Sequence, residues 1–67
     1  MSPARQMGKR LKKLREAREM SQAALATRAK ISRGYLIRLE AGRQDPTLGM
    51  LERLAKALGV PATELLG

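Results

Sequence analysis

The residues of this sequence whose types and spacing could do chemistry are concentrated in the stretch ISRGYLIRLEAG, residues 31–42. Arg33 and Arg38 lie there with Tyr35 between them, and arginine is the side chain whose fork fits the O6 and N7 atoms of guanine. The first turn of a helix and a residue about one turn further on project from one side. These side chains could therefore bind nucleic acid together, or they could form an ordinary solvated basic face.

The overall charge favours a polyanionic partner. Fourteen Lys and Arg stand against six Asp and Glu in 67 residues, so the net charge is +8. Residues 1–43 hold twelve basic and three acidic side chains, whereas residues 44–67 hold two basic and three acidic ones. A strong positive field on a small protein attracts polyanions. We expect nucleic acid as the partner and the first part of the chain as the binding part.

The missing residue types argue against enzyme chemistry. The chain has no Cys and no His, so it lacks disulfides, thiolate metal ligands and the commonest general base. A chain this short buries only about 60% of the surface that its unfolded form exposes, which makes a deep active-site cavity unexpected. We expect a protein that is not an enzyme and that uses no cofactor, no metal and no small-molecule ligand.

Nothing in the sequence predicts a membrane or secreted protein. No apolar run approaches the roughly 20 residues of a membrane span, and the N-terminus lacks the apolar core of a secretory signal. The basic outer face of the first helix would suit a membrane surface, but its apolar stripe is better explained by the core. The expected location is the cytoplasm, at the nucleoid.

The elements that must position these side chains all have helical periodicity. Five helices are expected, over residues 4–19, 22–29 and 33–41 and in two segments that begin after Thr47 and Pro61. In the first of them, Met7, Leu11 and Leu14 form one apolar stripe. With no strand signal, the expected fold is an all-α, compact five-helix orthogonal bundle that forms one domain over residues 1–67.

The third helix has defined ends. Ser32 is the predicted N-cap, which places Ile31 and Leu36 where they can pack together as a hydrophobic staple. Gly42 can adopt the left-handed conformation that ends a helix. The helix is therefore expected to enter and leave the bundle at fixed points.

The fourth helix is expected to bury a stripe and to end at Gly59, where a glycine suits the left-handed C-terminal position. The stripe consists of Leu48, Leu51, Leu54, Ala55 and Leu58.

Two short helices joined by a tight turn, the second with a basic outer face, are typical of proteins that place one helix in the DNA major groove. From about Gly8 to Leu66 the sequence resembles the Cro/phage-repressor (Xre-type) helix-turn-helix family of prokaryotic DNA-binding transcriptional regulators, which has the lambda-repressor-like fold. The pieces that carry the resemblance are SQAALA, LEAG, the following Pro46, and LAKALGVPATELL.

This resemblance implies a sequence-specific regulator of transcription. It would be a repressor that binds a pseudo-palindromic operator in double-stranded DNA as a homodimer, with the helix at 33–41 in the major groove. The alternative is a protein-interaction module of the same fold, such as an antitoxin or a coactivator-like adaptor. The basic residues Arg33 and Arg38 argue for DNA.

The resemblance also implies roles for individual residues. Base contacts fall on Ser32, Arg33, Gly34, Tyr35 and Arg38, and phosphate contacts on Gln22, Arg43 and Gln44. The first helix has charge on much of its circumference, so there the expected phosphate contact is Arg5, Lys9 or Arg10. Arg15 and Glu40 match family positions that form a largely buried ion pair, and Val60, Ala62 and Leu66 are the expected dimer interface.

Three positions leave alternatives open, and a fourth, Ala24, departs from the family pattern. Gly34 could allow close approach of DNA or could reflect packing of a small residue, and Ile37 could touch a thymine methyl or lean on the fourth helix. Lys30 stands where the family usually has glycine, so either Lys30 adopts a positive φ or the turn differs. Ala24 replaces a common Glu and removes a capping box.

Overall fold

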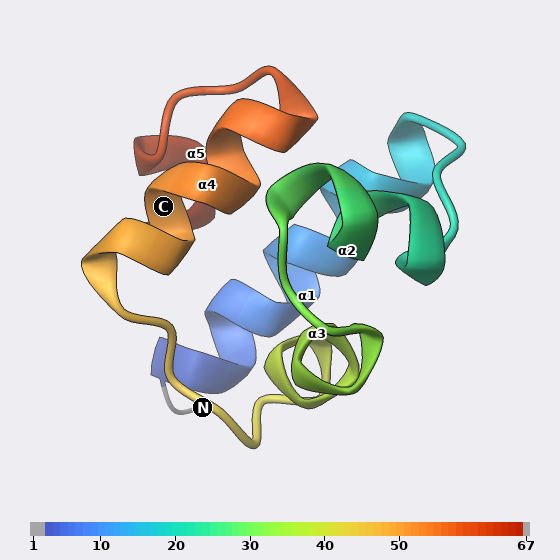
Figure 1. Cartoon of the computed structure of the whole chain (residues 1–67). Helices are drawn as coiled ribbons and strands as arrows, with labels where there is room; N and C mark the ends of the chain where they lie inside the picture. Colours follow the sequence, from blue (N-terminus) through green and yellow to red (C-terminus); the bar gives the residue numbers. More distant parts are fainter. Residues whose placement is uncertain (1–2, 67) are drawn as a thin grey trace.

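The computed structural model of the chain describes residues 3–66, so the two ends of the predicted domain, residues 1–2 and 67, lie outside it. Within the described residues it contains five helices and no strand (Figure 1). They are α1 (Pro3–Ala17), α2 (Gln22–Ala29), α3 (Arg33–Glu40), α4 (Leu48–Leu58) and α5 (Thr63–Leu66). The predicted fold class is confirmed. No helix in residues 3–66 is both long enough and apolar enough to cross a bilayer.

Hydroxyl caps set the starts of three helices. In α2, α3 and α4 the residue before the helix accepts a hydrogen bond, 3.0–3.1 Å long, from the backbone N–H three residues further on. The capping residues are Ser21, Ser32 and Thr47, as predicted. Each cap satisfies one of the N–H groups that a helix start leaves without an internal partner. The starts of these helices are therefore determined by local side-chain chemistry.

Residues with positive φ set the helix ends. Gly42 has a φ of 75° and Gly59 a φ of 72°, which confirms both predicted stops. The first helix ends at Ala17, two residues earlier than predicted, because the chain already turns at Glu19, where φ is 54°. Lys30 adopts φ 60° and ψ 45°, so the turn before α3 keeps a left-handed residue without a glycine. A side chain in that conformation costs about 1–2 kcal/mol.

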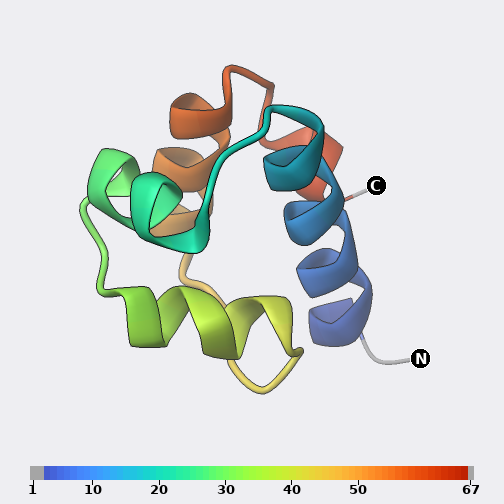
Figure 2. The ribbon, with the colours of Figure 1, turned by 90° about the vertical axis from the view of Figure 1, so that its right-hand side faces the viewer.

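The core is built from leucines that all five helices contribute. The largest fully buried side chains are Leu11, Leu25, Leu36, Leu39, Leu54 and Leu65. The first helix packs on α3 and α5, and α2 packs on α3 and α4, at steep angles (Figure 2). One predicted core residue is wrong: Leu48 is 71% exposed. It lies on the correct side of α4 by periodicity, but the first turn of α4 is at the edge of the bundle, where none of the helices in residues 3–66 covers it (Figure 1).

A close backbone contact joins α1 to the end of α3. A Cβ atom on Gly8 would lie 2.8 Å from the backbone oxygen of Glu40. Real Cβ atoms essentially never approach an oxygen that closely, and the obstacle is backbone that cannot rotate away. Gly8 has no local signal in the sequence, because the atoms that exclude a side chain there lie some thirty residues away in the chain.

We expect Gly8→Ala to lower the free energy of unfolding by about 1–3 kcal/mol, because the added methyl group must push α1 away from α3. The matched control is Gly49→Ala in α4, where a new Cβ meets nothing within 4 Å. There, alanine should raise the free energy of unfolding by about 0.5–1 kcal/mol through its better helix propensity. Urea denaturation of both variants measures the difference, and equal stabilities would contradict the close contact.

Candidate nucleic-acid interface

The turn between α2 and α3 holds α3 against the bundle from behind. Ile31 is half-buried against the core and Leu36 is fully buried, at the two positions of the predicted staple. The Ile31 N–H donates to the Ala26 carbonyl at 2.9 Å, which closes the turn on α2. The entry of α3 is thus fixed by a cap, a turn bond and apolar contacts together.

The outer side of α3 carries the predicted base-contacting residues. Leu36 and Leu39 face the core, and Gly34 and Arg38 lie one turn apart on the opposite, exposed side. Arg33 and Ser32 are exposed at the N-terminal end of the helix. Neither Arg33 nor Arg38 pairs with a carboxylate among residues 3–66. Their guanidinium groups are therefore available to a partner.

Tyr35 has a second role besides the predicted base contact. It is half-buried against the core, and the Arg38 guanidinium lies over its ring, 5.9 Å from the centroid. Such cation–π contacts favour one placement of the arginine. Tyr35 and Arg38 are three residues apart, a spacing that places two side chains next to each other on a helix, so this contact could have been inferred from the sequence. The ring thus supports the arginine that the resemblance places at the bases.

Of the two interpretations of Gly34, the structure argues against the packing of a small residue. A Cβ at this position would meet only Arg38 Nη1, at an ordinary 3.6 Å. Packing among the described residues therefore does not require glycine here. Ile37 is 42% exposed on the same side of α3, so it presents an apolar surface beside the two arginines.

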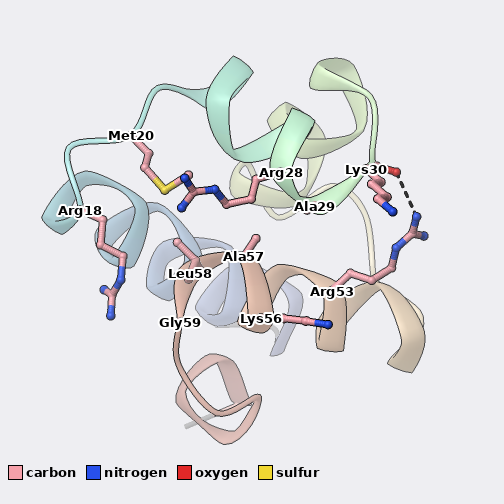
Figure 3. A pocket seen from close by; sticks show the side chains of 10 residues that line it. All are labelled: Arg18, Met20, Arg28, Ala29, Lys30, Arg53, Lys56, Ala57, Leu58 and Gly59. Atoms are coloured by element: carbon pink, nitrogen blue, oxygen red, sulfur yellow. Dashed lines mark hydrogen bonds between the residues drawn. The ribbon is translucent and has the colours of Figure 1, made fainter.

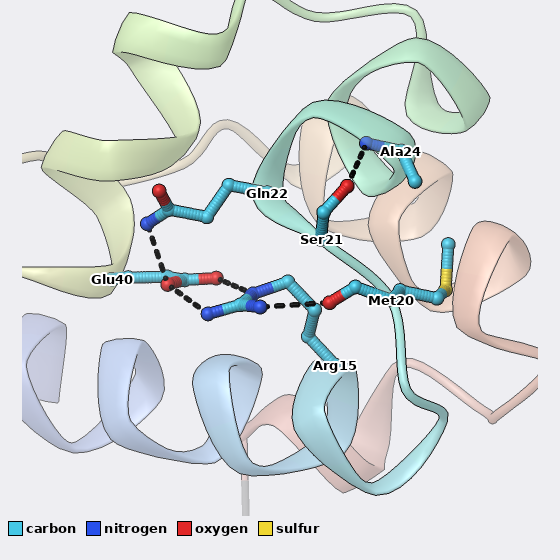
Figure 4. Close-up of polar contacts among 6 residues, drawn as sticks. All are labelled: Arg15, Met20, Ser21, Gln22, Ala24 and Glu40. Atoms are coloured by element: carbon cyan, nitrogen blue, oxygen red, sulfur yellow. Dashed lines mark hydrogen bonds and ion pairs between the residues drawn. The ribbon is translucent and has the colours of Figure 1, made fainter.

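A buried polar network joins α1, α2 and α3 (Figure 4). Arg15 Nε donates to Glu40 Oε2 at 2.7 Å, and Arg15 Nη2 donates to Glu40 Oε1 at 3.1 Å. Arg15 Nη1 donates to the Met20 carbonyl at 2.8 Å. The two charged side chains are only 10% and 5% exposed. Bidentate geometry of this kind is the strong form of a salt bridge.

The charge state of Arg15 follows from this network. Hydrogen bonding to Glu40 raises the pKa of Arg15 above its ordinary value, although burial acts in the opposite direction. The guanidinium is therefore charged at every pH at which the protein is handled. Within the described residues, no buried side-chain nitrogen or oxygen lacks a hydrogen-bond partner. The desolvation cost of burying the pair is thus offset by the hydrogen bonds that Arg15 donates to Glu40 and to the Met20 carbonyl.

Gln22 connects this network to the predicted phosphate contacts. Its Nε2 donates to Glu40 Oε1 at 3.1 Å, so the first residue of α2 braces the last residue of α3. A side-chain amide nitrogen carries two hydrogens, and this bond uses one of them. Gln22 can therefore hold Glu40 and still donate to an anion at the start of α2.

The other phosphate candidates divide into two groups. Arg43 is exposed and Gln44 half-buried in the loop after α3, and the Arg43 N–H donates to the Arg38 carbonyl at 2.9 Å. Arg10 lies elsewhere: its Nη1 donates to the Leu66 carbonyl at 3.4 Å, beside α5. That position does not support the expected phosphate contact of Arg10, because the side chain is directed to the C-terminal helix.

The expected dimer patch surrounds the same helix. Val60 and Ala62 are half-buried and Leu66 is 61% exposed, whereas Leu65 is fully buried in the core. Val60 and Ala62, just before α5, thus remain partly accessible, and Leu66 within it remains largely accessible.

The acidic side chains of the described residues do not form a metal site. Among residues 3–66, no group of three of them could hold a metal ion.

Comparison with known proteins identifies the arrangement. A helix-turn-helix family model matches residues 11–65. The immunity repressor protein of Bacillus phage phi105 is 39% identical over 61 residues, which are 91% of this chain and 42% of the repressor. An uncharacterized HTH-type transcriptional regulator of Sinorhizobium fredii, y4dJ, is 38% identical over 60 residues, 90% of this chain and 78% of that protein.

The fold also matches solved structures. The restriction-modification controller protein C.AhdI from Aeromonas hydrophila superposes with a TM-score of 0.91 at 34% identity, over 92% of this chain and 94% of that chain. The chain thus spans nearly all of the controller protein but less than half of the phage repressor.

We expect Glu40→Ala to lower the free energy of unfolding by about 3–5 kcal/mol, because it leaves the Arg15 charge buried without a counterion. The double variant Arg15→Met/Glu40→Leu should lose much less, since it removes both charges and keeps apolar volume. Thermal melts of both variants measure the contrast. An unchanged melting temperature for Glu40→Ala would show that the ion pair is absent or exposed in solution.

Proposed function

Because the chain belongs to the Cro/C1-type helix-turn-helix family of DNA-binding transcriptional regulators, we propose that it is a repressor that binds a pseudo-palindromic operator as a homodimer. In this proposal α3 enters the major groove. The observation that carries it is the exposed side of α3, where Arg33 and Arg38 have no carboxylate partner among residues 3–66. Two cations on this face without a counterion in the described part of the chain favour a polyanion such as DNA, whereas an apolar or acidic face there would argue for a protein partner.

Direct reading of bases is assigned to the exposed side of α3. Arg33 and Arg38 can each offer two N–H groups to a guanine, and Ser32 can donate or accept at the N-terminal end of the helix. Tyr35 holds the Arg38 guanidinium over its ring before DNA arrives, which lowers the entropy lost on binding. Gly34 removes a side chain at the centre of the face, so the α3 backbone can come close to the base edges.

Phosphate contacts are assigned to both ends of the helix-turn-helix. Gln22 lies at the start of α2, and Arg43 and Gln44 lie in the loop that follows α3. Groups on the two sides of a recognition helix can hold its register against the two backbone strands without reading sequence. The network through Glu40 makes the position of Gln22 depend on the end of α3.

Dimer formation is assigned to Val60, Ala62 and Leu66. These residues lie in the part of the chain that carries two basic and three acidic side chains, so two copies can approach there without strong repulsion. Two domains related by a two-fold axis read half-sites about one helical turn apart. The name of the phage relative, an immunity repressor, supports repression as the outcome.

The central test is in vitro selection of bound duplexes, which we expect to return a palindrome. On that operator, Arg38→Ala should cost about 1–3 kcal/mol of binding free energy and relax the preference at one base pair. Arg43→Ala should weaken operator and random duplex equally and reduce the salt dependence of binding. Affinities measured on both duplexes at several salt concentrations separate the two effects. Equal affinity of the parent protein for operator and random DNA would refute the proposal.

The dimer is tested separately. Leu66→Glu should shift the protein to monomer in sedimentation velocity and weaken operator binding, because it places two charges in the apolar patch. Thr63→Glu is the matched control, since Thr63 is an exposed residue of the same helix outside the patch. If Leu66→Glu dimerises as well as the control, the interface lies elsewhere.

A further inference from the structure

A second basic surface lies away from the residues assigned to DNA. A groove of about 720 Å³ runs between α2 and α4 and reaches the end of α1 (Figure 3). Its walls come from residues 18 and 20, 28–30, 53 and 56–59. We call it the α2–α4 groove. None of the residues assigned above to bases, phosphates or the dimer lines it.

The rim of the α2–α4 groove is basic. It carries Arg18, Arg28, Lys30, Arg53 and Lys56, which are five of the fourteen basic residues of the chain. None of the five pairs with a carboxylate among residues 3–66. Arg53 is held in place because its Nη2 donates to the Lys30 carbonyl at 3.2 Å. The rim therefore has positive charge that the described part of the chain does not neutralise.

The floor of the groove is apolar. Ala29 and Leu58 are buried at its base, and Met20 and Ala57 are half-buried beside them. Figure 3 shows the Arg28 side chain extending across the groove toward Met20, with Lys30 and Arg53 close together at the other end. Thioether and methyl groups of this kind adapt to aliphatic side chains. A ligand that fits must therefore combine negative charge with apolar bulk.

We propose that the α2–α4 groove binds an acidic peptide segment of a partner protein, with carboxylates on the rim and at least one aliphatic side chain on the floor. The groove is open on one side, and its volume lies in the range of small-ligand sites, which leaves room for a few side chains of a peptide. Charge complementarity guides such an encounter and selects against basic partners. No residue of α3 lines the groove, although Lys30 on its rim belongs to the turn that precedes α3.

Nucleic acid fits the groove less well. Single strands bind by stacking bases on aromatic rings, and the one aromatic residue of the chain, Tyr35, lies in α3. A duplex backbone could reach the rim cations but has no apolar group to cover the floor. A second copy of this chain is also a poor occupant, because no ten-residue segment of it carries more than two acidic residues.

The test is selection of peptides from a random displayed library on the folded protein. We expect enrichment of sequences in which Asp and Glu surround Leu, Ile or Met, with affinity that falls as salt rises. Binding of an enriched peptide should weaken about tenfold in Arg28→Glu/Lys56→Glu, because two attractive pairs become repulsive. Enrichment without acidic residues would overturn the proposal.

Two variants with the same change of charge locate the site. Lys12→Glu/Lys13→Glu alters exposed residues of α1 outside the groove, and Arg33→Glu/Arg38→Glu alters the face of α3. Both should keep peptide binding within about twofold, an effect of net charge alone. Loss of peptide binding in the α3 variant would overturn the proposal. So would duplex affinity that falls as far in the groove variant as in the α3 variant, since the groove would then be a second DNA surface.

Discussion

The position of α3 depends on the ion pair between Arg15 and Glu40. Glu40 is the last residue of α3, and the carboxylate receives two hydrogen bonds from α1 and one from the start of α2. Burying two charges is costly unless they are paired and hydrogen-bonded, and here the two side chains share two hydrogen bonds while no buried side-chain nitrogen or oxygen of the described residues lacks a partner. The geometry therefore tolerates little movement, and the same contacts that stabilise the bundle set the angle at which α3 presents its outer side.

The fold was largely predictable because the signals that start and end its helices are local. A hydroxyl three residues before an N–H, or a glycine after an apolar stripe, acts within one turn of helix, so Ser21, Ser32, Thr47, Gly42 and Gly59 could all be identified in the sequence. The ion pair required the family resemblance, because nothing local connects residues that are 25 positions apart.

What could not be predicted depends on contacts between distant segments. Leu48 has the correct periodicity for the core but lies beyond the neighbouring helices, and periodicity carries no information about where a helix stops being covered. Arg10 could be placed on an exposed side of α1, but its direction toward α5 follows from how the two helices cross. The α2–α4 groove was likewise hidden, since its basic residues come from three separate segments.

Lys30 connects the turn of the helix-turn-helix with that groove. Its left-handed backbone costs conformational energy that a glycine would not, while its side chain adds a cation to the rim and its carbonyl holds Arg53. Thermal stability therefore favours glycine at this position, whereas the positive charge of the groove favours lysine. Selection for a higher melting temperature alone would favour glycine at position 30. Such a variant would be more stable but would lose one cation of the groove rim, and a folding assay would not detect that loss.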